Sequence, residues 1–269
     1  MRFDLHCHST CSDGTESPSQ VAARVAARGV EVFALTDHDT CAGCAEIAAL
    51  LPGVRVLRAV ELSCDDAGRT VHVLAYDRGG AWDALVDRLA AVRTARANRV
   101  RVMCAKLERR GIVLDVEALA ATAAHESVGR PHLARAMVAA GHASSVKDAF
   151  ARHLYDHGPV DVPHTALPLF EALAVGRAAG AALSLAHPHL YGARARELLV
   201  THQRDGLTGV EAYYGAYHSA ERADWLRIAD ELGLVATGGS DWHGPDDARV
   251  APGIDFGVPR TDALLRWLA

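Results

Sequence analysis

The chain has 269 residues, half of them hydrophobic, and a formal net charge of −5. This composition excludes a disordered chain, and the negative charge argues against a basic surface for long nucleic acids. No stretch is long and apolar enough to cross a membrane, and no charged-then-apolar leader precedes the first expected strand. We therefore expect a cytoplasmic protein that is one large domain, or a barrel with an insertion.

Near the start, Phe3 and Leu5 alternate as in a short strand that delivers His6 and His8. Residues i and i+2 of a strand point to the same side, so the two imidazoles face one point. The turn sequence that follows contains Asp13, which can supply an oxygen ligand or accept a hydrogen bond from a ligand histidine. This stretch is a candidate metal site, although an isolated histidine pair is more often a surface feature.

Short β-branched strands and helices then follow one another. Strands are expected over 30–36, 54–62, 70–76, 181–186, 208–214 and 234–237, and helices over 18–29, 42–51, 219–232 and 262–269. Strand, helix, strand at these spacings is typical of parallel βα units.

A helical block interrupts this rhythm. One long helix is expected over 81–110, and three shorter helices over 116–124, 131–140 and 145–155. We interpret 91–162 as an inserted helical subdomain, and 1–90 together with 163–269 as the barrel.

Six cysteines lie in the first half of the chain without a disulfide-like pattern, which predicts reduced and mostly buried side chains. The spacing Cys41-Ala-Gly-Cys44 is that of a thioredoxin-like motif. The sequence around it lacks the tryptophan and proline of a redox site, so we do not assign it redox chemistry.

Histidine and carboxylate residues recur at or just after the expected strand ends. They are His6 and His8, His38, Glu61, His187, and Asp241 with His243. In βα barrels the carboxyl ends of the strands carry the active site. Any single residue has a structural explanation, but so many buried imidazoles and carboxylates are costly unless they are paired or bind metal.

The motifs HCHSTCSDG, LTDHDT, VEL, VHVLAY, AHP and GSDWH resemble, in this order, those of the PHP (polymerase and histidinol phosphatase) family. The resemblance implies an α/β fold, a distorted (β/α)7 TIM-like barrel, with an inserted all-helical subdomain that caps the active site. It also implies two or three divalent metal ions. Manganese or iron is favoured by the ligand set, and zinc is an alternative.

The resemblance further implies which residues bind the ions. The first ion would be held by His6, His8, Glu61 and Asp241, the second by Asp13, His38 and His243, and the third by Glu61, His72 and His187. Some relatives have histidine at the position of Asp13, so the second set is more anionic here. Asp13, His38, Glu61 and Asp241 are the expected catalytic residues.

Among PHP proteins, the likeness is greatest to phosphatases that act on 3′,5′-bisphosphonucleosides or AMP. It implies that Arg130 and His132 reach the substrate phosphate; the guanidinium fork and the helix start beside it both suit an anion. His218 is a further candidate for a phosphate contact or proton donor. Six histidines have no assigned role: His125, His142, His153, His157, His164 and His202.

The expected reaction is hydrolysis of a phosphoric monoester by a hydroxide that bridges two metal ions. The expected partner is a small phosphorylated nucleotide, with no long nucleic acid and no membrane, and the chain is expected to be a monomer or small homo-oligomer. Alternatives are a histidinol-phosphate phosphatase, a short-oligonucleotide exonuclease, and a silent scaffold that binds a metabolite or partner protein.

Overall fold

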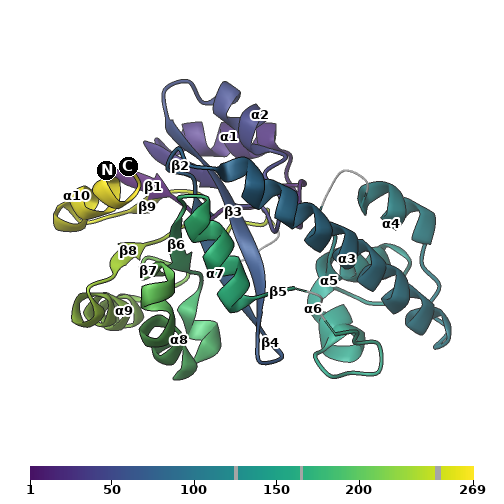
Figure 1. The fold of residues 1–269 in the computed structure, drawn as a ribbon. Helices are drawn as coiled ribbons and strands as arrows, with labels where there is room; N and C mark the ends of the chain where they lie inside the picture. Colours follow the sequence, from purple (N-terminus) through teal and green to yellow (C-terminus); the bar gives the residue numbers. More distant parts are fainter. Residues whose placement is uncertain (124–126, 164–165, 246–249) are drawn as a thin grey trace.

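Figure 1 shows the computed structural model, which describes residues 1–123, 127–163, 166–245 and 250–269. In these residues one curled sheet has the strand order β8-β7-β6-β4-β3-β2-β1-β9, and β5 pairs with β3. The strands are β1 (Arg2–Asp4), β2 (Val32–Leu35), β3 (Arg55–Asp66), β4 (Arg69–Tyr76), β5 (Leu167–Pro168), β6 (Ala182–Leu185), β7 (Leu207–Glu211), β8 (Val235–Thr237) and β9 (Ile254–Asp255).

The barrel closes where the segments after β1 and β8 run side by side. The Leu5 N–H donates to the Gly238 carbonyl (3.1 Å), and the Asp241 N–H donates to the His6 carbonyl (2.8 Å). The short strand β9 pairs antiparallel with β1. β1 to β4 and β6 to β8 therefore form a distorted seven-stranded barrel, which confirms the predicted fold class.

The expectation of parallel βα units throughout was wrong for β4. This strand is antiparallel to both of its neighbours, β3 and β6. β3 continues to Asp66, so only Ala67 and Gly68, both with positive φ, separate it from β4. A two-residue connection allows a hairpin, whereas a parallel crossover needs about a dozen residues or more.

Ten α-helices lie in the described residues. They are α1 (Pro18–Ala27), α2 (Cys44–Leu50), α3 (Trp82–Glu108), α4 (Val116–Ala123), α5 (Arg130–Ala139), α6 (Val146–Ala149), α7 (Leu169–Ala178), α8 (Arg194–His202), α9 (Ser219–Leu232) and α10 (Val258–Trp267). One π-helical and two 3₁₀ segments accompany them: η1 (Phe150–Leu154), η2 (Pro188–Tyr191) and η3 (Gln203–Asp205). None of these helices is both long and apolar enough to cross a membrane.

α1 shows how local sequence sets a helix. The Ser17 hydroxyl accepts a hydrogen bond from the Gln20 N–H, and Pro18 occupies the first turn, where its missing N–H has no cost. Gly29, with φ of 63°, follows the end of the helix, as the sequence predicted. The helices α7 and α8 were not predicted.

α3 links the barrel to the helical layer. Its first half buries Trp82, Leu85 and Leu89 in the cluster around the barrel strands, and full burial of such a side chain contributes about 1.5–3 kcal/mol. Its second half packs in a separate apolar cluster with α5 and η1. Figure 1 shows α4, α5 and α6 gathered around this far half. The expected boundary at residue 91 falls inside this continuous helix.

Candidate metal centre

His6 and His8 lie in the extended segment after β1, which pairs with the backbone after β8. Their alternation places both rings on one side, with centroids 5.2 Å apart. The two segments approach closely because position 239 is glycine: a Cβ atom on Gly239 would lie 2.3 Å from the His6 amide nitrogen. Any other residue there would push the histidines away from the site.

Glu61 lies at the centre of the site, in the middle of β3 rather than at the strand end that the sequence predicted. Its carboxylate lies near five imidazoles: Oε2 is 3.4 Å from His6 Nε2, 3.2 Å from His8 Nε2 and 3.0 Å from His38 Nδ1, and Oε1 is 3.1 Å from His72 Nδ1 and 3.0 Å from His187 Nε2. Burial acts to raise the Glu61 pKa, but the imidazoles hold it well below its usual range. Glu61 is therefore an ionised carboxylate that joins ligands from several strands.

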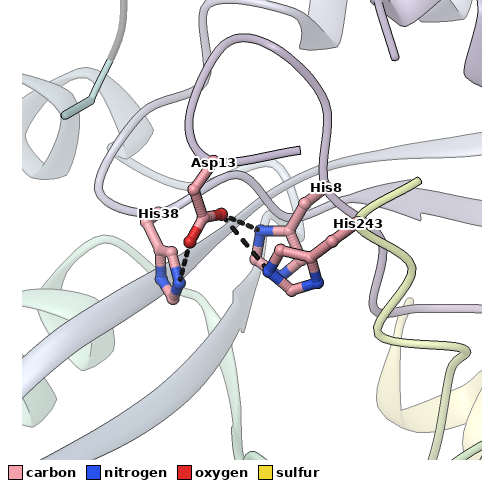
Figure 2. A group of neighbouring side chains, drawn as sticks. All are labelled: His8, Asp13, His38 and His243. Atoms are coloured by element: carbon pink, nitrogen blue, oxygen red, sulfur yellow. Dashed lines mark ion pairs between the residues drawn. The ribbon is translucent and has the colours of Figure 1, made fainter. Parts of the chain in front are cut away.

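Asp13 faces a second group of imidazoles (Figure 2). Its oxygens lie 3.7 Å from His8 Nδ1, 3.6 Å from His38 Nε2 and 3.3 Å from His243 Nε2. Burial acts to raise the Asp13 pKa, but His38 and His243 hold it well below its usual range. Asp13 is thus an anionic member of the site and not only a turn residue.

Asp241 reaches the first group of residues from the segment after β8. Its Oδ1 lies 3.3 Å from His6 Nε2 and 3.4 Å from His8 Nε2, and its Oδ2 accepts a hydrogen bond from the Tyr214 hydroxyl (2.9 Å). The Asp241 backbone has φ of 51°, and His187 and Asp39 also have positive φ. Such backbone in non-glycine residues persists where the surroundings impose it.

The donor atoms fit divalent metal ions. In this site, four buried imidazole nitrogens make no hydrogen bond to the described residues: His6 Nε2, both nitrogens of His8, and His38 Nδ1. Three groups of ligand atoms lie within 4.8 Å of one another: His8, Asp13, His38 and His243; His6, His8 and Glu61; and His38, Glu61 and His72. Mixed imidazole and carboxylate sets suit manganese, iron and zinc.

Comparison with known proteins identifies the family. The PHP domain family model matches residues 4–108. The chain is 34% identical over 251 residues to the 3′,5′-nucleoside bisphosphate phosphatase of Chromobacterium violaceum, an alignment that covers 91% of this chain and 88% of the relative. The chain belongs to the PHP family.

Two further proteins are similar to this chain over most of its length. The chain is 34% identical over 249 residues to the 5′-3′ exoribonuclease of Haemophilus influenzae, covering 91% of this chain and 90% of the relative. The structure of a Chromobacterium violaceum amidohydrolase with bound sulfate and no metal matches with a TM-score of 0.85 and 32% identity, over 95% and 92% of the two chains. This PHP chain is a metal-dependent phosphoesterase, and therefore a hydrolase.

The structure brings together all nine residues that the PHP motifs implied as ligands. His8, His38 and Glu61 each belong to two of the three groups, so these three side chains connect neighbouring groups of ligand atoms. His187 joins the group around Glu61, with its Nε2 3.2 Å from His72 Nδ1. The assignment of each residue to a particular ion stays a prediction.

Sequence reasoning missed Glu211, which supports the site from β7. Its Oε1 lies 3.0 Å from His6 Nδ1, and its Oε2 accepts the His187 N–H at 2.7 Å. Burial acts to lower the His6 pKa, but the charges of Glu211 and Glu61 raise it to about 10. Glu211 could have been recognised as a carboxylate at the end of a strand. It was missed because the strand was expected to continue to Tyr214.

Asp37 is a second supporting carboxylate. It accepts hydrogen bonds from the Ser9 N–H (2.8 Å), the Ser9 hydroxyl (2.7 Å) and the Ser12 hydroxyl (2.6 Å). These bonds hold the segment that carries His8 and Asp13 against the end of β2. Burial raises the Asp37 pKa although these hydrogen bonds act to lower it.

Arg130 lines a cavity of about 800 Å³ that lies between the barrel and the helical layer. Asp13, His38, His72 and His187 also line this cavity. The Arg130 guanidinium pairs with Asp156 and lies over the Phe150 ring. The structure therefore places Arg130 and four of the nine candidate ligands on walls of the same cavity.

The other two predicted substrate contacts lie elsewhere. His132 is buried at the start of α5, where its Nδ1 accepts the Gly129 N–H (3.1 Å) and its ring contacts the Ser12 backbone. His218 is exposed and caps the start of α9. Neither lines the cavity as formed by the described residues, so their predicted phosphate contacts stay predictions. His125 and His164 lie outside the described residues.

Proposed function

We propose that this PHP enzyme hydrolyses a phosphate monoester of a small nucleotide, either a 3′,5′-bisphosphonucleoside or AMP. The observation that carries the proposal is the cavity over the ligand cluster, which is lined by charged residues from both layers. Pockets of roughly 300–1,000 Å³ take small molecules, and this cavity of about 800 Å³ lies in that range. The name of the Chromobacterium violaceum phosphatase supports the same substrate class.

The cavity offers cations on opposite walls for an anionic substrate. Arg69 and Arg194 come from the barrel side, whereas Arg99 and Arg130 come from the helical layer. The Arg130 side chain is 25% exposed, and its partner Asp156 is 73% exposed, so solvent screens this ion pair. A substrate phosphate can replace Asp156 as the partner of Arg130, because a guanidinium binds phosphate oxygens through two parallel hydrogen bonds.

The nine clustered ligands would hold two or three divalent ions, for which we favour manganese or iron over zinc. Bound ions of this kind polarise phosphoryl oxygens and lower the pKa of water. The chain itself holds the donors in place: Glu211 orients His6, and Tyr214 orients one oxygen of Asp241. Such supporting hydrogen bonds fix the tautomer and direction of the ligands before substrate arrives.

A phosphate-release screen tests the proposal. The metal-loaded protein would be assayed with 3′,5′-bisphosphoadenosine, AMP, histidinol phosphate and, as a control without a phosphomonoester, a cyclic nucleotide. We expect the two nucleotides to be hydrolysed with the highest kcat/KM. Preference for histidinol phosphate, or no release from any monoester, would contradict the proposal, and bound metal without turnover would favour the scaffold alternative.

The Haemophilus influenzae relative, named a 5′-3′ exoribonuclease at the same 34% identity, supports a second candidate activity on short oligonucleotides. The same chemistry at a phosphodiester would need the cavity to admit more than one nucleotide. A length series of 5′-phosphorylated oligoribonucleotides separates the two. We expect kcat/KM to fall from the mononucleotide to the trinucleotide, whereas an exonuclease would show the opposite trend.

A further inference from the structure

Cys41 and Cys44 lie together beside a second cavity, whose lining includes none of the candidate metal ligands. The Cys44 N–H donates to the Cys41 carbonyl (3.1 Å), which closes a four-residue turn. Both sulfur atoms contact one carbonyl oxygen, that of Ala59, at 3.5 Å and 3.4 Å. Ends of such a turn lie within about 7 Å, which is compatible with the 4.4–6.8 Å that a disulfide requires between Cα atoms.

The cavity beside these thiols has a volume of about 510 Å³ and is separate from the ligand cluster. Both cysteines line it, together with the cations Arg58 and Arg93 and the exposed carboxylate of Asp83. Arg58 pairs with Asp77 at 2.7 Å and lies 3.5 Å from Asp83, so Arg93 adds the net positive charge of the lining. Cys41 is partly exposed and Cys44 is nearly buried. A small molecule in this cavity would therefore meet the Cys41 sulfur before that of Cys44.

The fold brings to Cys41 a tryptophan that the local sequence lacks. The indole of Trp82, from the start of α3, lies against Cys41. The neighbouring Cys44 thiol lowers the Cys41 pKa despite burial, and Trp82 and Arg58 lower this pKa further. The pKa of Cys44 is raised well above its ordinary value, because Cys41 and burial both favour its protonated form. Cys41 is thus the thiol that ionises more readily and can attack a disulfide. Cys44 stays protonated until it resolves the mixed disulfide on Cys41.

We propose that Cys41 and Cys44 form a thiol–disulfide exchange site that takes small disulfides bearing carboxylates. The Cys41 thiolate attacks one sulfur of the disulfide and expels the other half as a thiolate. Cys44 then loses its proton to solvent and attacks the Cys41 sulfur, which expels the second half. The protein gives up two electrons and two protons, and the bound disulfide is reduced to two thiols.

Mass spectrometry after incubation with glutathione disulfide tests this site without reference to phosphoesterase activity. Trypsin releases both cysteines in one peptide, residues 29–55, whereas Cys7 and Cys11, Cys64 and Cys104 fall in other peptides. In the wild type we expect peptide 29–55 to lose two hydrogens. In Cys44→Ser we expect one glutathione on Cys41, and in Cys41→Ser we expect the peptide to stay unmodified.

Three outcomes would overturn the proposal: a reduced peptide 29–55 in the wild type, an unmodified Cys41 in Cys44→Ser, or faster modification of Cys11 than of Cys41. Cys104→Ser is the matched control and should react like the wild type. If a variant fails to fold, the wild-type time course still decides, because the mixed disulfide on Cys41 must appear before the intramolecular one.

The charge of the cavity gives a second test, in a protein that keeps both cysteines. Arg58→Gln should slow the reaction with glutathione disulfide by about threefold or more, since a nearby cation attracts an anionic reactant. The reaction with neutral 2-hydroxyethyl disulfide should slow less, because this reagent feels only the effect of Arg58 on the Cys41 pKa. Equal slowing of both reagents would overturn the assignment of the cavity to carboxylate-bearing disulfides.

Discussion

The two walls of the main cavity are built differently. On the barrel side, His38, His72 and His187 line the cavity, and each contacts the carboxylate of Glu61, which is buried behind them. On the helical wall, Arg130 is partly exposed and is paired with an aspartate in solvent. The barrel wall is therefore preorganised for metal chemistry, whereas the helical wall can exchange one partner for another. This difference suits a fixed reaction on the barrel wall and substrate selection on the helical wall.

The largest effect is expected when a candidate metal ligand on the barrel side is removed. Asp241→Ala should lower kcat/KM by more than about 1,000-fold, since loss of even one preorganised donor costs roughly 10²–10³-fold. Phosphate release from the best substrate of the screen is the measurement, with circular dichroism to check the fold. Asp255→Ala, on the exposed strand β9, is the control and should be fully active. Full activity of a folded Asp241→Ala protein would reject the proposed role of this site.

The next largest effect tests how the helical layer docks on the barrel. Arg96 Nε donates to Asp39 Oδ2 at 2.7 Å, and both side chains are at least 90% buried. Arg96→Ala leaves a buried carboxylate without its cation, which costs about 3–5 kcal/mol of unfolding free energy. Urea denaturation measures the loss, and Arg101→Ala on the exposed face of α3 is the control. A loss below about 1 kcal/mol would show that docking does not depend on this pair.

A substitution of Glu211 tests whether the carboxylate beside His6 supports metal binding. Glu211→Gln keeps the shape but removes the charge beside His6, and loss of such a supporting partner costs about 10–100-fold in metal affinity or activity. A metal titration followed by phosphate release should show a higher midpoint, with partial recovery at saturating metal. Glu231→Gln, on the surface of α9, should titrate like the wild type. An unchanged midpoint would show that the charge of Glu211 does not contribute to metal affinity.

The smallest expected effect lies on the helical wall. Arg130→Ala should raise KM by about tenfold and leave kcat within about threefold, because hydrogen bonds to charged groups contribute about 1.5–3 kcal/mol. Steady-state kinetics measure the change, and Arg152→Ala in the nearby exposed η1 is the control. A large fall in kcat with unchanged KM would place Arg130 with the reacting groups and remove the contrast between the walls.

The PHP motifs in the sequence implied nine ligands that the structure brings together, and several of them follow strand ends that meet at one rim; that they bind metal stays a prediction. Sequence reasoning failed where a long-range contact decides the outcome. Glu61 was expected at a strand end because β3 was expected to stop at residue 62. The same error hid the hairpin between β3 and β4, so the antiparallel direction of β4 was not predicted. The Cys41 environment was equally invisible, since Trp82 reaches it from a distant position in the chain. His132 illustrates the limit of a motif, because its ring lies in a contact between α5 and the loop of Ser12.

The positive φ angles of Asp39, His187 and Asp241 bear on attempts to engineer heat resistance. Each such angle costs about 1–3 kcal/mol in a non-glycine residue, so substitution by glycine or asparagine at these positions is an attractive stabilising change on backbone grounds alone. His187 and Asp241 are also candidate ligands, and Asp39 holds the helical layer in place. A thermostable form of the enzyme is therefore better sought on exposed helix faces, such as that of α9, than at the turns where the backbone is least relaxed.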